Sequence, residues 1–340
     1  MKIFVYEHIT SGALCDQHLP ENLTKEGDLM LMAILMDLKK ISGIKLIILR
    51  DYRLVNNHLS NCNIYQHYTV TNLENFNLFW MQCLDEADAV LAIAPETEGV
   101  LATLQQKIID RNKLILGSHP DAIKITTDKL LCGHKISKAG LACPPAICAK
   151  NWPTDSWNHD NGYIIKPIDG AGCENTQYFI NTKKLREWLS DQTQNDLETL
   201  LIQNYVKGSS ISLSLLVNGH DAFVLGMNKQ LIKNERNQLI FTGCVVNGLS
   251  DDELSIAKAQ SIAETVCQTI PGLWGFIGID IILSETGPII IDINPRLTTS
   301  YVGLHDSLAI NPAELLLLMK DEGIDALPEI TQRYPISIQT

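Results

Sequence analysis

The first 120 residues alternate between short apolar runs and longer segments in which apolar residues recur every three or four positions. The short runs predict β-strands and the longer segments predict helices, because side chains share a face every second residue in a strand and about every 3.6 residues in a helix. Such alternation is typical of a parallel sheet with crossover helices. We expect strands at 2–6, 45–49, 89–94 and 114–116, and helices at 27–40, 75–84 and 100–112.

The pattern beyond residue 120 is richer in strand-like runs, so a mixed α/β (α+β) fold is expected. The 340 residues are enough for two or three domains. We predict domains at 1–120, 121–205 and 206–340. The further elements expected are helices at 126–138, 183–190, 251–269 and 312–320 and strands at 163–166, 176–180 and 200–205.

Two apolar runs late in the chain each carry one carboxylate. Asp280 lies in the first run and Asp292 in the second, and Asn294 follows on the same face of an extended strand. A turn at 284–288 joins the runs, so a hairpin would bring the three side chains together. Their oxygen atoms suit Mg²⁺, which water and nucleotide phosphates would complete. The alternative is a hairpin with stray polar residues, which the cost of burying unpaired acids disfavours.

Composition narrows the class of protein. The net charge of -12 argues against general nucleic-acid binding, which needs a basic face. No apolar run approaches the roughly 20 residues that span a bilayer, so no membrane partner is expected. The nine cysteines are scattered without a Cys-x-x-Cys pair, which is typical of reduced thiols in a cytoplasmic protein.

Two lysines lie next to segments that could bind phosphate. Lys166 ends an apolar strand just before Gly170, Ala171 and Gly172, where glycines would let backbone amides approach an anion closely. The segment matches neither the phosphate-loop motif nor the dinucleotide fingerprint, and taken alone it is an ordinary strand end. Lys129 opens a predicted helix, where a solvated surface lysine is equally compatible with the sequence.

Three other segments could take part in binding. The strand at 200–205 leads into Val206 and could pair its backbone with an adenine edge, although alone it is simply a strand. Arg296 would lie beside the predicted metal site and could bind a carboxylate or phosphate bidentately, or form a structural salt bridge. The polar loops at 7–12 and 95–99 follow strands, and such strand ends are default ligand positions in open α/β sheets.

The order of these pieces resembles the ATP-grasp superfamily of carboxylate–amine ligases. The resemblance covers about 120–310, and the first 120 residues resemble the Rossmann-like parallel-sheet domain that precedes it. It implies an ATP-grasp fold, ATP as a substrate, and Mg²⁺ as the metal ion, with Mn²⁺ as the alternative. The segments that carry it are Asp128-Lys129, Ile165-Lys166-Pro167 with the glycine-rich loop, 203–208, Asp280, and Asp292-Ile-Asn294-Pro-Arg296.

Roles carry over only where the motifs match. Asp292 stands where the family usually has glutamate, the hinge acid often seen at Gln203 or Asn204 is absent, and Ser210 is near the position of a common ribose-binding glutamate. The resemblance implies a mobile phosphate loop, catalytic roles for a lysine and an arginine, and metal ligands on the hairpin. The implied residues are Lys129, Lys166, Gly170, Ala171, Gly172, Gln203, Asn204, Val206 and Ser210 for ATP, Lys166 and Arg296 for catalysis, and Asp280, Asp292 and Asn294 for the metal.

Four further segments resemble the tyramine–glutamate ligase branch, which serves methanofuran-type cofactor synthesis. They are Glu7-His-Ile-Thr-Ser11-Gly12, Glu26-Gly27, Asn228-Lys-Gln230 and the run 294–303. The branch implies that ATP activates glutamate as an acyl phosphate, which tyramine, tyrosine or a related amine attacks to give an amide in methylofuran-type synthesis. The implied substrate-binding residues are Glu7, Ser11, Asn228, Gln230 and Tyr301.

Other interpretations stay open at the level of sequence. One is a different ATP-grasp amino-acid ligase, of the D-alanine–D-alanine or a glutamate-adding type. Another is a nucleotide-binding protein without turnover, although the complete set of hairpin acids and Arg296 speaks against it. Glu7 could hold an ammonium group or have a structural role. Amino-acid and amine substrates are the expected small-molecule partners, and a homodimer is a family-level expectation.

Overall fold

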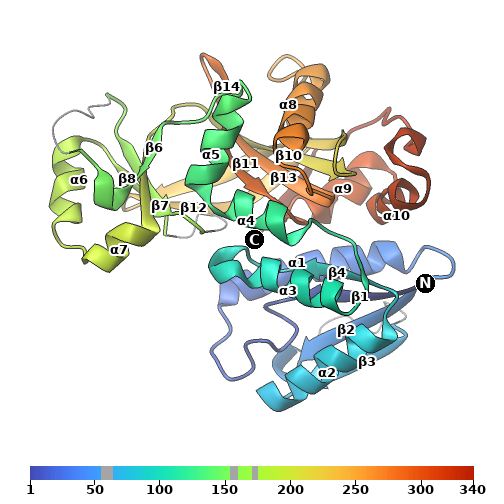
Figure 1. Cartoon of the computed structure of the whole chain (residues 1–340). Coiled ribbons are helices and arrows are strands. Elements are labelled where there is room, and N and C mark those ends of the chain that lie inside the picture. The colour runs from blue at the N-terminus through green and yellow to red at the C-terminus, as the bar shows by residue number, and fades with distance from the viewer. Residues whose placement is uncertain (55–63, 154–159, 171–174) are drawn as a thin grey trace.

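The computed structural model describes residues 1–54, 64–153, 160–170 and 175–340. In this part of the chain it forms a five-stranded parallel sheet near the start and a ten-stranded sheet from the remainder (Figure 1). The predicted mixed α/β fold is confirmed. None of the described helices is both long and apolar enough to span a membrane.

The first sheet has the strand order β3-β2-β1-β4-β5, and all its pairs are parallel. Helix α1 covers one face, where it packs on Ile3 and Val5, and α2 and α3 cover the other, where they pack on Phe4 and Tyr6. The elements are β1 (Lys2–Glu7), α1 (Glu21–Leu38), β2 (Lys45–Asp51), β3 (Gln66–Val70), α2 (Leu73–Glu86), β4 (Ala89–Ile93), α3 (Val100–Asp110) and β5 (Leu114–Ile115), with short 3₁₀ helices at Tyr52–Leu54 and Thr97–Gly99.

Sequence analysis missed β3 and placed the start of α1 at residue 27 instead of Glu21. Both errors have one cause. Strand β3 lies at the sheet edge and alternates exposed with half-buried residues, and the first turn of α1 is mostly exposed, Leu23 included. Apolar periodicity reports burial against a core, so elements or turns that face water leave little signal.

Two helices, α4 (Pro120–Thr127) and α5 (Lys129–Lys138), connect the sheets. The single helix predicted at 126–138 is therefore wrong in its first turn. Asp128 separates the two helices in an extended conformation, and its side chain caps α5 by accepting bonds from the backbone N–H groups of Leu130 and Leu131. An N-terminal cap satisfies amides that have no partner within the helix, so the break is also what begins α5.

The second sheet runs β14-β13-β10-β11-β12-β8-β7-β9-β6, and β15 pairs with β12. Helices α5 and α8 pack beside one face of β10 and β13, and α9 and α10 lie on the other side. Its elements are β6 (Ala146–Cys148), β7 (Tyr163–Pro167), β8 (Gln177–Phe179), α6 (Thr182–Leu189), α7 (Gln194–Thr199), β9 (Leu200–Asn204), β10 (Ser209–Val217), β11 (Ala222–Glu235), β12 (Gln238–Val246), α8 (Ile256–Thr269), β13 (Gly275–Ser284), β14 (Gly287–Asn294), α9 (Tyr301–Leu308), α10 (Pro312–Glu322) and β15 (Ile336–Gln339), with 3₁₀ helices at Ala149–Asn151 and Ile324–Ala326.

The predicted hairpin, the strand at β9 and the last helix are confirmed, and β6, α7, α9 and β15 were not predicted. Helix α8 begins at Ile256 instead of residue 251, because Ser255 caps it by accepting a bond from the N–H of Lys258. The missed elements are short, with no more than eight residues each. Segments of this length contain too few turns or alternations to define a period.

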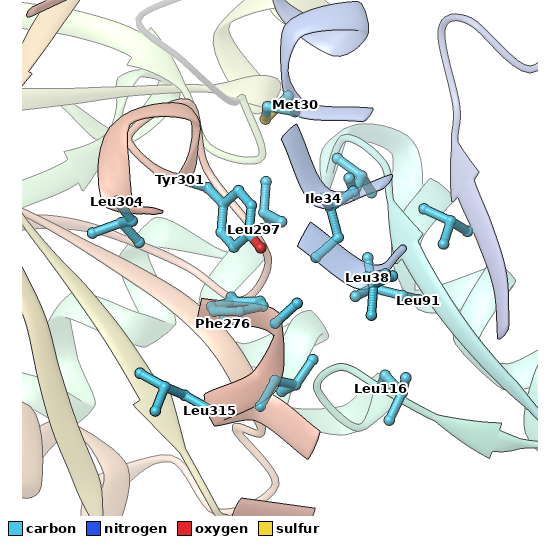
Figure 2. Packing of buried hydrophobic residues seen from close by; sticks show 14 of the residues in the cluster. Met30, Ile34, Leu38, Leu91, Leu116, Phe276, Leu297, Tyr301, Leu304 and Leu315 are labelled. Carbon is cyan, nitrogen blue, oxygen red and sulfur yellow. The ribbon is translucent and has the colours of Figure 1, made fainter. Parts of the chain in front are cut away.

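One apolar core joins the two sheets. Met30, Ile34 and Leu38 of α1 face Leu297 and Tyr301, which come from the segment after β14 and from α9 (Figure 2). These side chains are at most 6% exposed, so α1 is shared between the parallel sheet and the second sheet's helices. Burial of this apolar area fixes where the side chains of α1 lie relative to the second sheet.

Candidate active site

A cavity of about 470 Å³ opens between the strands of the second sheet, and we refer to it as the main cavity. Strands β7, β9 and β10 to β14 contribute to its wall, together with Lys129 at the start of α5 and the segment after β14. Glu26 of α1 also lines it, so the first sheet's helix supplies part of the wall. Pockets of this size hold small-molecule ligands in many proteins.

The hairpin of β13 and β14 brings the predicted acids together. Asp280 lies directly opposite Asp292 in the antiparallel register, and Asn294 lies opposite Gly278. The side-chain amide of Asn294 donates a hydrogen bond of 3.1 Å to Asp280 Oδ2, and all three side chains line the main cavity. The predicted convergence is confirmed, and the role of these residues as metal ligands stays a prediction.

The electrostatics of the hairpin favour a bound cation. Burial, and then the facing carboxylate of Asp292, raise the pKa of Asp280 to about 6, against hydrogen bonds from Asn294 and Gln230 that lower it. Two carboxylates and an amide oxygen are hard donors that fit Mg²⁺. In the described part of the chain no three His, Cys, Asp or Glu residues are arranged to hold a metal, so phosphate or water oxygens would have to complete this set.

Both predicted phosphate-binding lysines point into this region. Lys129 Nζ lies 2.8 Å from Asp292 Oδ2 and donates to the carbonyl oxygen of Gly170 at 2.5 Å. Burial alone would lower the pKa of Lys129, but Asp292 outweighs it, so the pKa is raised and the side chain stays cationic. Lys166 is buried on β7, and its Nζ donates to the carbonyl oxygen of Ile291 at 3.3 Å. Two cations therefore stand beside the hairpin acids.

The other residues predicted to bind ATP fall into three groups. Gly170, Gln203, Val206 and Ser210 line the main cavity. Asn204 is the last residue of β9 and is not among the lining residues that the structure describes. Ala171 and Gly172 lie outside the described residues.

Arg296 is held by the carboxylate of Glu96, which lies in the loop after β4 of the first sheet. Its Nε and Nη2 lie 2.9 and 3.1 Å from the two carboxylate oxygens of Glu96, and Nη1 donates to the carbonyl oxygen of Leu297. Burial opposes the charge of Arg296, but Glu96 raises its pKa above the ordinary value. The loop that carries Glu96 also touches the glycine-rich segment, because the backbone N–H of Glu98 donates to Asp169. Arg296 also lines the main cavity, so a planar guanidinium held by Glu96 forms part of its wall.

The residues predicted to bind substrate are not gathered in one place. Gln230 lines the main cavity and donates to Asp280 Oδ1 at 2.9 Å. Asn228 is buried and bonded to Ser212 and Ser214, and Tyr301 is buried with its hydroxyl donating to Asp37.

Two other predicted substrate residues lie in the loop after β1. Glu7 is 3% exposed and accepts hydrogen bonds from the backbone N–H groups of Ile9 and Thr10 and from the Thr10 hydroxyl. Ser11 is buried and donates to the carbonyl oxygen of His8. Neither residue is among the described residues that line the main cavity. The structure therefore brings only Gln230 of the five to the hairpin.

Sequence reasoning overlooked the pairing of Glu96 with Arg296. It did not place Glu26 or Thr299 in the cavity wall, although both lie in segments that carry the resemblance to the tyramine–glutamate ligase branch. Glu96 lay in a loop that the strand-end rule marked as a ligand position, so a signal for it existed. Glu26 is more than 100 positions from every other described residue that lines the cavity, and no local pattern reports such long-range neighbours. Only the fold brings these groups together.

Comparison with known families settles the class of protein. The ATP-grasp domain family matches residues 126–300, which is more than half of the chain, and the pre ATP-grasp 3 domain family matches residues 44–123. The chain belongs to the ATP-grasp family. The match ends beyond Asn294 and Arg296, so the ATP-grasp region contains the hairpin, both lysines and the arginine.

Individual relatives agree with this ATP-grasp assignment. The tyramine–L-glutamate ligase of Methanocaldococcus jannaschii is 28% identical over 320 residues, which are 93% of this chain and 88% of that protein. The enzyme of the same name from Methanocaldococcus fervens is 30% identical over 301 residues, 87% of this chain and 88% of that protein. A crystal structure assigned to the ATP-grasp superfamily, from Archaeoglobus fulgidus, superposes with a TM-score of 0.72 at 23% identity, covering 100% of this chain and 92% of that chain.

These similarities make the chain an ATP-dependent ligase that joins a carboxylate to an amine with a C–N bond. The geometry is compatible with that chemistry, because phosphoryl transfer depends mainly on positioning and charge neutralisation. The ATP-grasp hairpin, Lys129, Lys166 and Arg296 place acidic and basic groups around one cavity.

Proposed function

We propose that this ATP-grasp protein activates the carboxylate of glutamate with ATP and joins it to a primary amine, such as tyramine or tyrosine. The observation that carries the proposal is the facing pair of Asp280 and Asp292 in the same cavity as Lys129 and Arg296. The similarity to tyramine–L-glutamate ligases over most of the chain supports glutamate and an aromatic amine as the substrates.

The residues present fit a magnesium–nucleotide complex. Asp280, Asp292 and Asn294 would hold Mg²⁺, with Mn²⁺ as the alternative, and the ion would supply charge neutralisation at the phosphates. Lys129 and Lys166, which lie beside the hairpin, would contact phosphate oxygens. Lys129 already bonds to Asp292, so ATP binding would exchange that bond for contacts to phosphate.

The reaction would proceed through an acyl phosphate. A carboxylate oxygen of glutamate attacks the γ-phosphorus, the bond to the bridging oxygen breaks, and ADP leaves with that bond's electron pair. The amine then attacks the acyl carbon, phosphate leaves, and the ammonium product loses a proton to give the amide. Arg296, fixed by Glu96, would donate hydrogen bonds to the oxygen that becomes negative in each step, and such preorganised donors often supply the largest catalytic contribution.

The nucleotide and the protection of the intermediate involve further predicted residues. Gln203, Val206 and Ser210 would surround the adenosine, mostly through the backbone. Gly170 begins the loop that the family resemblance assigns to phosphate closure, and water must be kept from an acyl phosphate. We also propose the domain division at residues 120 and 205, in which the 121–205 unit carries this loop.

The biological setting is proposed from the same similarity. Glutamate and tyramine would place the reaction in methylofuran-type cofactor synthesis. A cytoplasmic location and a homodimer stay predictions, and size-exclusion chromatography with light scattering would test the second.

Phosphate release from Mg-ATP tests the proposal directly. Reactions would contain glutamate with tyramine, with tyrosine, or with no added amine, and mass spectrometry would identify the product. Amine-dependent ADP, phosphate and a glutamyl amide are the expected results. Turnover with other amino acids but not glutamate would favour a different ATP-grasp amino-acid ligase, and tight ATP binding without turnover on a wide panel would favour a nucleotide-binding protein.

A further inference from the structure

Glu26 places a carboxylate in the wall of the main cavity from outside the ATP-grasp region. It lies in the second turn of α1, is half-buried, and accepts a hydrogen bond from the hydroxyl of Thr299. Thr299 itself lies three residues after Arg296 and also lines the cavity. The carboxylate therefore lines the same cavity as Arg296, although it belongs neither to the hairpin nor to the lysine pair.

The charge around Glu26 is not balanced by the protein. Among the residues that the structure describes, no lysine, arginine or histidine forms an ion pair with Glu26, whereas Arg296 is paired with Glu96. Both carboxylate oxygens of Glu96 already bind Arg296, and Glu26 is a second carboxylate in the same cavity wall. A negative charge in a partly desolvated wall is stabilised by a cation from a ligand.

The local packing keeps this carboxylate in place. Gly27 follows Glu26, and a Cβ at Gly27 would lie 2.7 Å from the carboxyl carbon of Glu7, so α1 approaches the end of β1 closely. The same helix buries Met30, Ile34 and Leu38 in the core that joins both sheets (Figure 2). Glu26 therefore belongs to a helix that is packed into this core, and regular elements position binding groups more accurately than loops do.

The wall of the main cavity contains both apolar and polar side chains. Phe241 and Cys244 contribute apolar wall from β12, and Ser300 contributes a hydroxyl. Burial, and after it the charge of Glu26, raise the pKa of the Cys244 thiol to about 12, so this thiol stays neutral and forms part of the apolar wall. An organic compound with a charged head and an apolar body fits such surroundings better than an inorganic cation does.

We propose that Glu26 binds the primary ammonium group of a substrate, with Thr299 orienting its carboxylate. The inference rests on the proposed function, which supplies two sources of that group. One is the amine acceptor, and the other is the α-ammonium of glutamate. Both make the same charged hydrogen bond, so the experiment has to distinguish them.

Calorimetric binding to the full-length protein tests the proposal without turnover. Wild type and Glu26→Gln would be titrated, with Mg²⁺ and a non-hydrolysable ATP analogue, with two matched pairs of compounds. The first pair is tyramine and 4-ethylphenol, and the second is glutamate and glutarate, so each pair differs only by the ammonium group. Glu21→Gln, which changes an exposed carboxylate on the same helix, is the control.

The expected result is a loss of about tenfold to hundredfold in affinity for one ammonium compound in Glu26→Gln, because a hydrogen bond to a charged group is removed. Affinity for its partner without the ammonium group should be unchanged. Loss for tyramine identifies the acceptor as the source, and loss for glutamate identifies the donor. Thr299→Val, which keeps the carboxylate, should show a smaller loss of the same kind and serves if the first variant does not fold.

The inference would be overturned if wild type and Glu26→Gln bound both ammonium compounds with equal affinity. It would also be overturned if neither protein bound either compound measurably. The proposed function has its own readout, which is hydroxamate formation by wild type with glutamate, Mg-ATP and hydroxylamine. Hydroxylamine is small and mostly uncharged at neutral pH, so this trapping reports activation of glutamate without the amine site. Absent hydroxamate together with Glu26-dependent tyramine binding would remove the glutamate proposal and leave the ammonium site standing.

Discussion

The loop after β1 and the hairpin of β13 and β14 both carry acids in apolar surroundings, yet they use them differently. The carboxylate of Glu7 accepts three hydrogen bonds from its own loop and is 3% exposed. The carboxylates of Asp280 and Asp292 face each other across two strands and line the main cavity. The loop satisfies its acid with its own donors, whereas the hairpin acids take theirs from other elements, with Lys129 on Asp292 and Gln230 on Asp280.

This contrast shows what separates a structural acid from a candidate ligand. Burial raises the pKa of both Glu7 and Asp280, so the direction of the pKa alone does not distinguish them. The distinguishing feature is the source of compensation. Donors from the adjacent backbone stabilise a local turn, whereas two facing carboxylates favour cations, of which Lys129 supplies one and the pKa of Asp280 is still raised to about 6.

Asp292→Asn should give the largest effect among changes that test this contrast. It keeps the size of the side chain and removes one of the two facing charges, so magnesium-dependent phosphate release should fall by about 10³-fold or more. The thermal midpoint should fall moderately, because the buried ion pair with Lys129 is lost, and relief of the repulsion that raises the pKa of Asp280 offsets only part of this loss. Glu7→Gln is the comparison variant and should retain activity within a few-fold. Full activity of Asp292→Asn would contradict the metal assignment.

Glu96→Gln should give the next largest effect, because the bidentate pair holds Arg296 in place. We expect kcat to fall by about tenfold to hundredfold, while KM for ATP changes only a few-fold. Glu96→Asp should recover part of the rate. Glu98→Gln is a matched control on the same loop, since its side chain is exposed. A loss confined to ATP affinity would show that the pair supports nucleotide binding instead of the chemical step.

The sequence was sufficient for features that repeat or that lie close together along the chain. Apolar periodicity located β1, β2, β4 and the hairpin, and strand geometry predicted that Asp280, Asp292 and Asn294 converge. The ATP-grasp motifs supplied the fold of the rest, because their order along the chain is more specific than any one of them.

The sequence was insufficient where contacts between distant parts of the chain determine which side chains meet. Nothing near Arg296 predicts that Glu96, 200 positions away, binds its guanidinium. Asn228 and Tyr301 occur in segments that resemble a known branch, but both side chains are buried and hydrogen-bonded, and neither is among the described residues that line the main cavity. A resemblance in sequence places a residue near a site, and only the fold determines which way its side chain points.

Gly27→Ala should lower the stability of the fold more than the rate of the reaction. It therefore tests whether the loop after β1, where Glu7 lies, has a structural role. An added Cβ would lie 2.7 Å from the Glu7 carboxyl carbon, which forces α1 or the loop to shift. The free energy of unfolding should fall by about 1–3 kcal/mol in urea denaturation. Gly133→Ala on α5 is the control, because a Cβ there meets no atom within 4 Å, and it should stabilise by about 0.5–1 kcal/mol. Equal effects of the two changes would show that the close contact carries no cost.

His8 gives the smallest expected effect and tests whether the loop after β1 is a structural cluster. Burial lowers its pKa to about 4 from the model-compound value of 6.5, and the Tyr6 hydroxyl lies 2.8 Å from its Nδ1. Because the folded state disfavours the protonated ring, the stabilisation is fully present above pH 6.5 and is lost as the pH falls toward 4. The loss between pH 7 and pH 5 should be on the order of 1 kcal/mol, allowing for partial exposure.

The measurement is urea denaturation of wild type and His8→Asn at a series of pH values, taken as the difference between the two proteins. Asparagine does not titrate but can still accept a hydrogen bond, so the variant should lose the pH-dependent part that His8 contributes. Parallel stability curves for the two proteins would contradict a buried neutral histidine. They would also weaken the view that this loop, unlike the hairpin, satisfies its polar groups internally and has no charge left for a ligand.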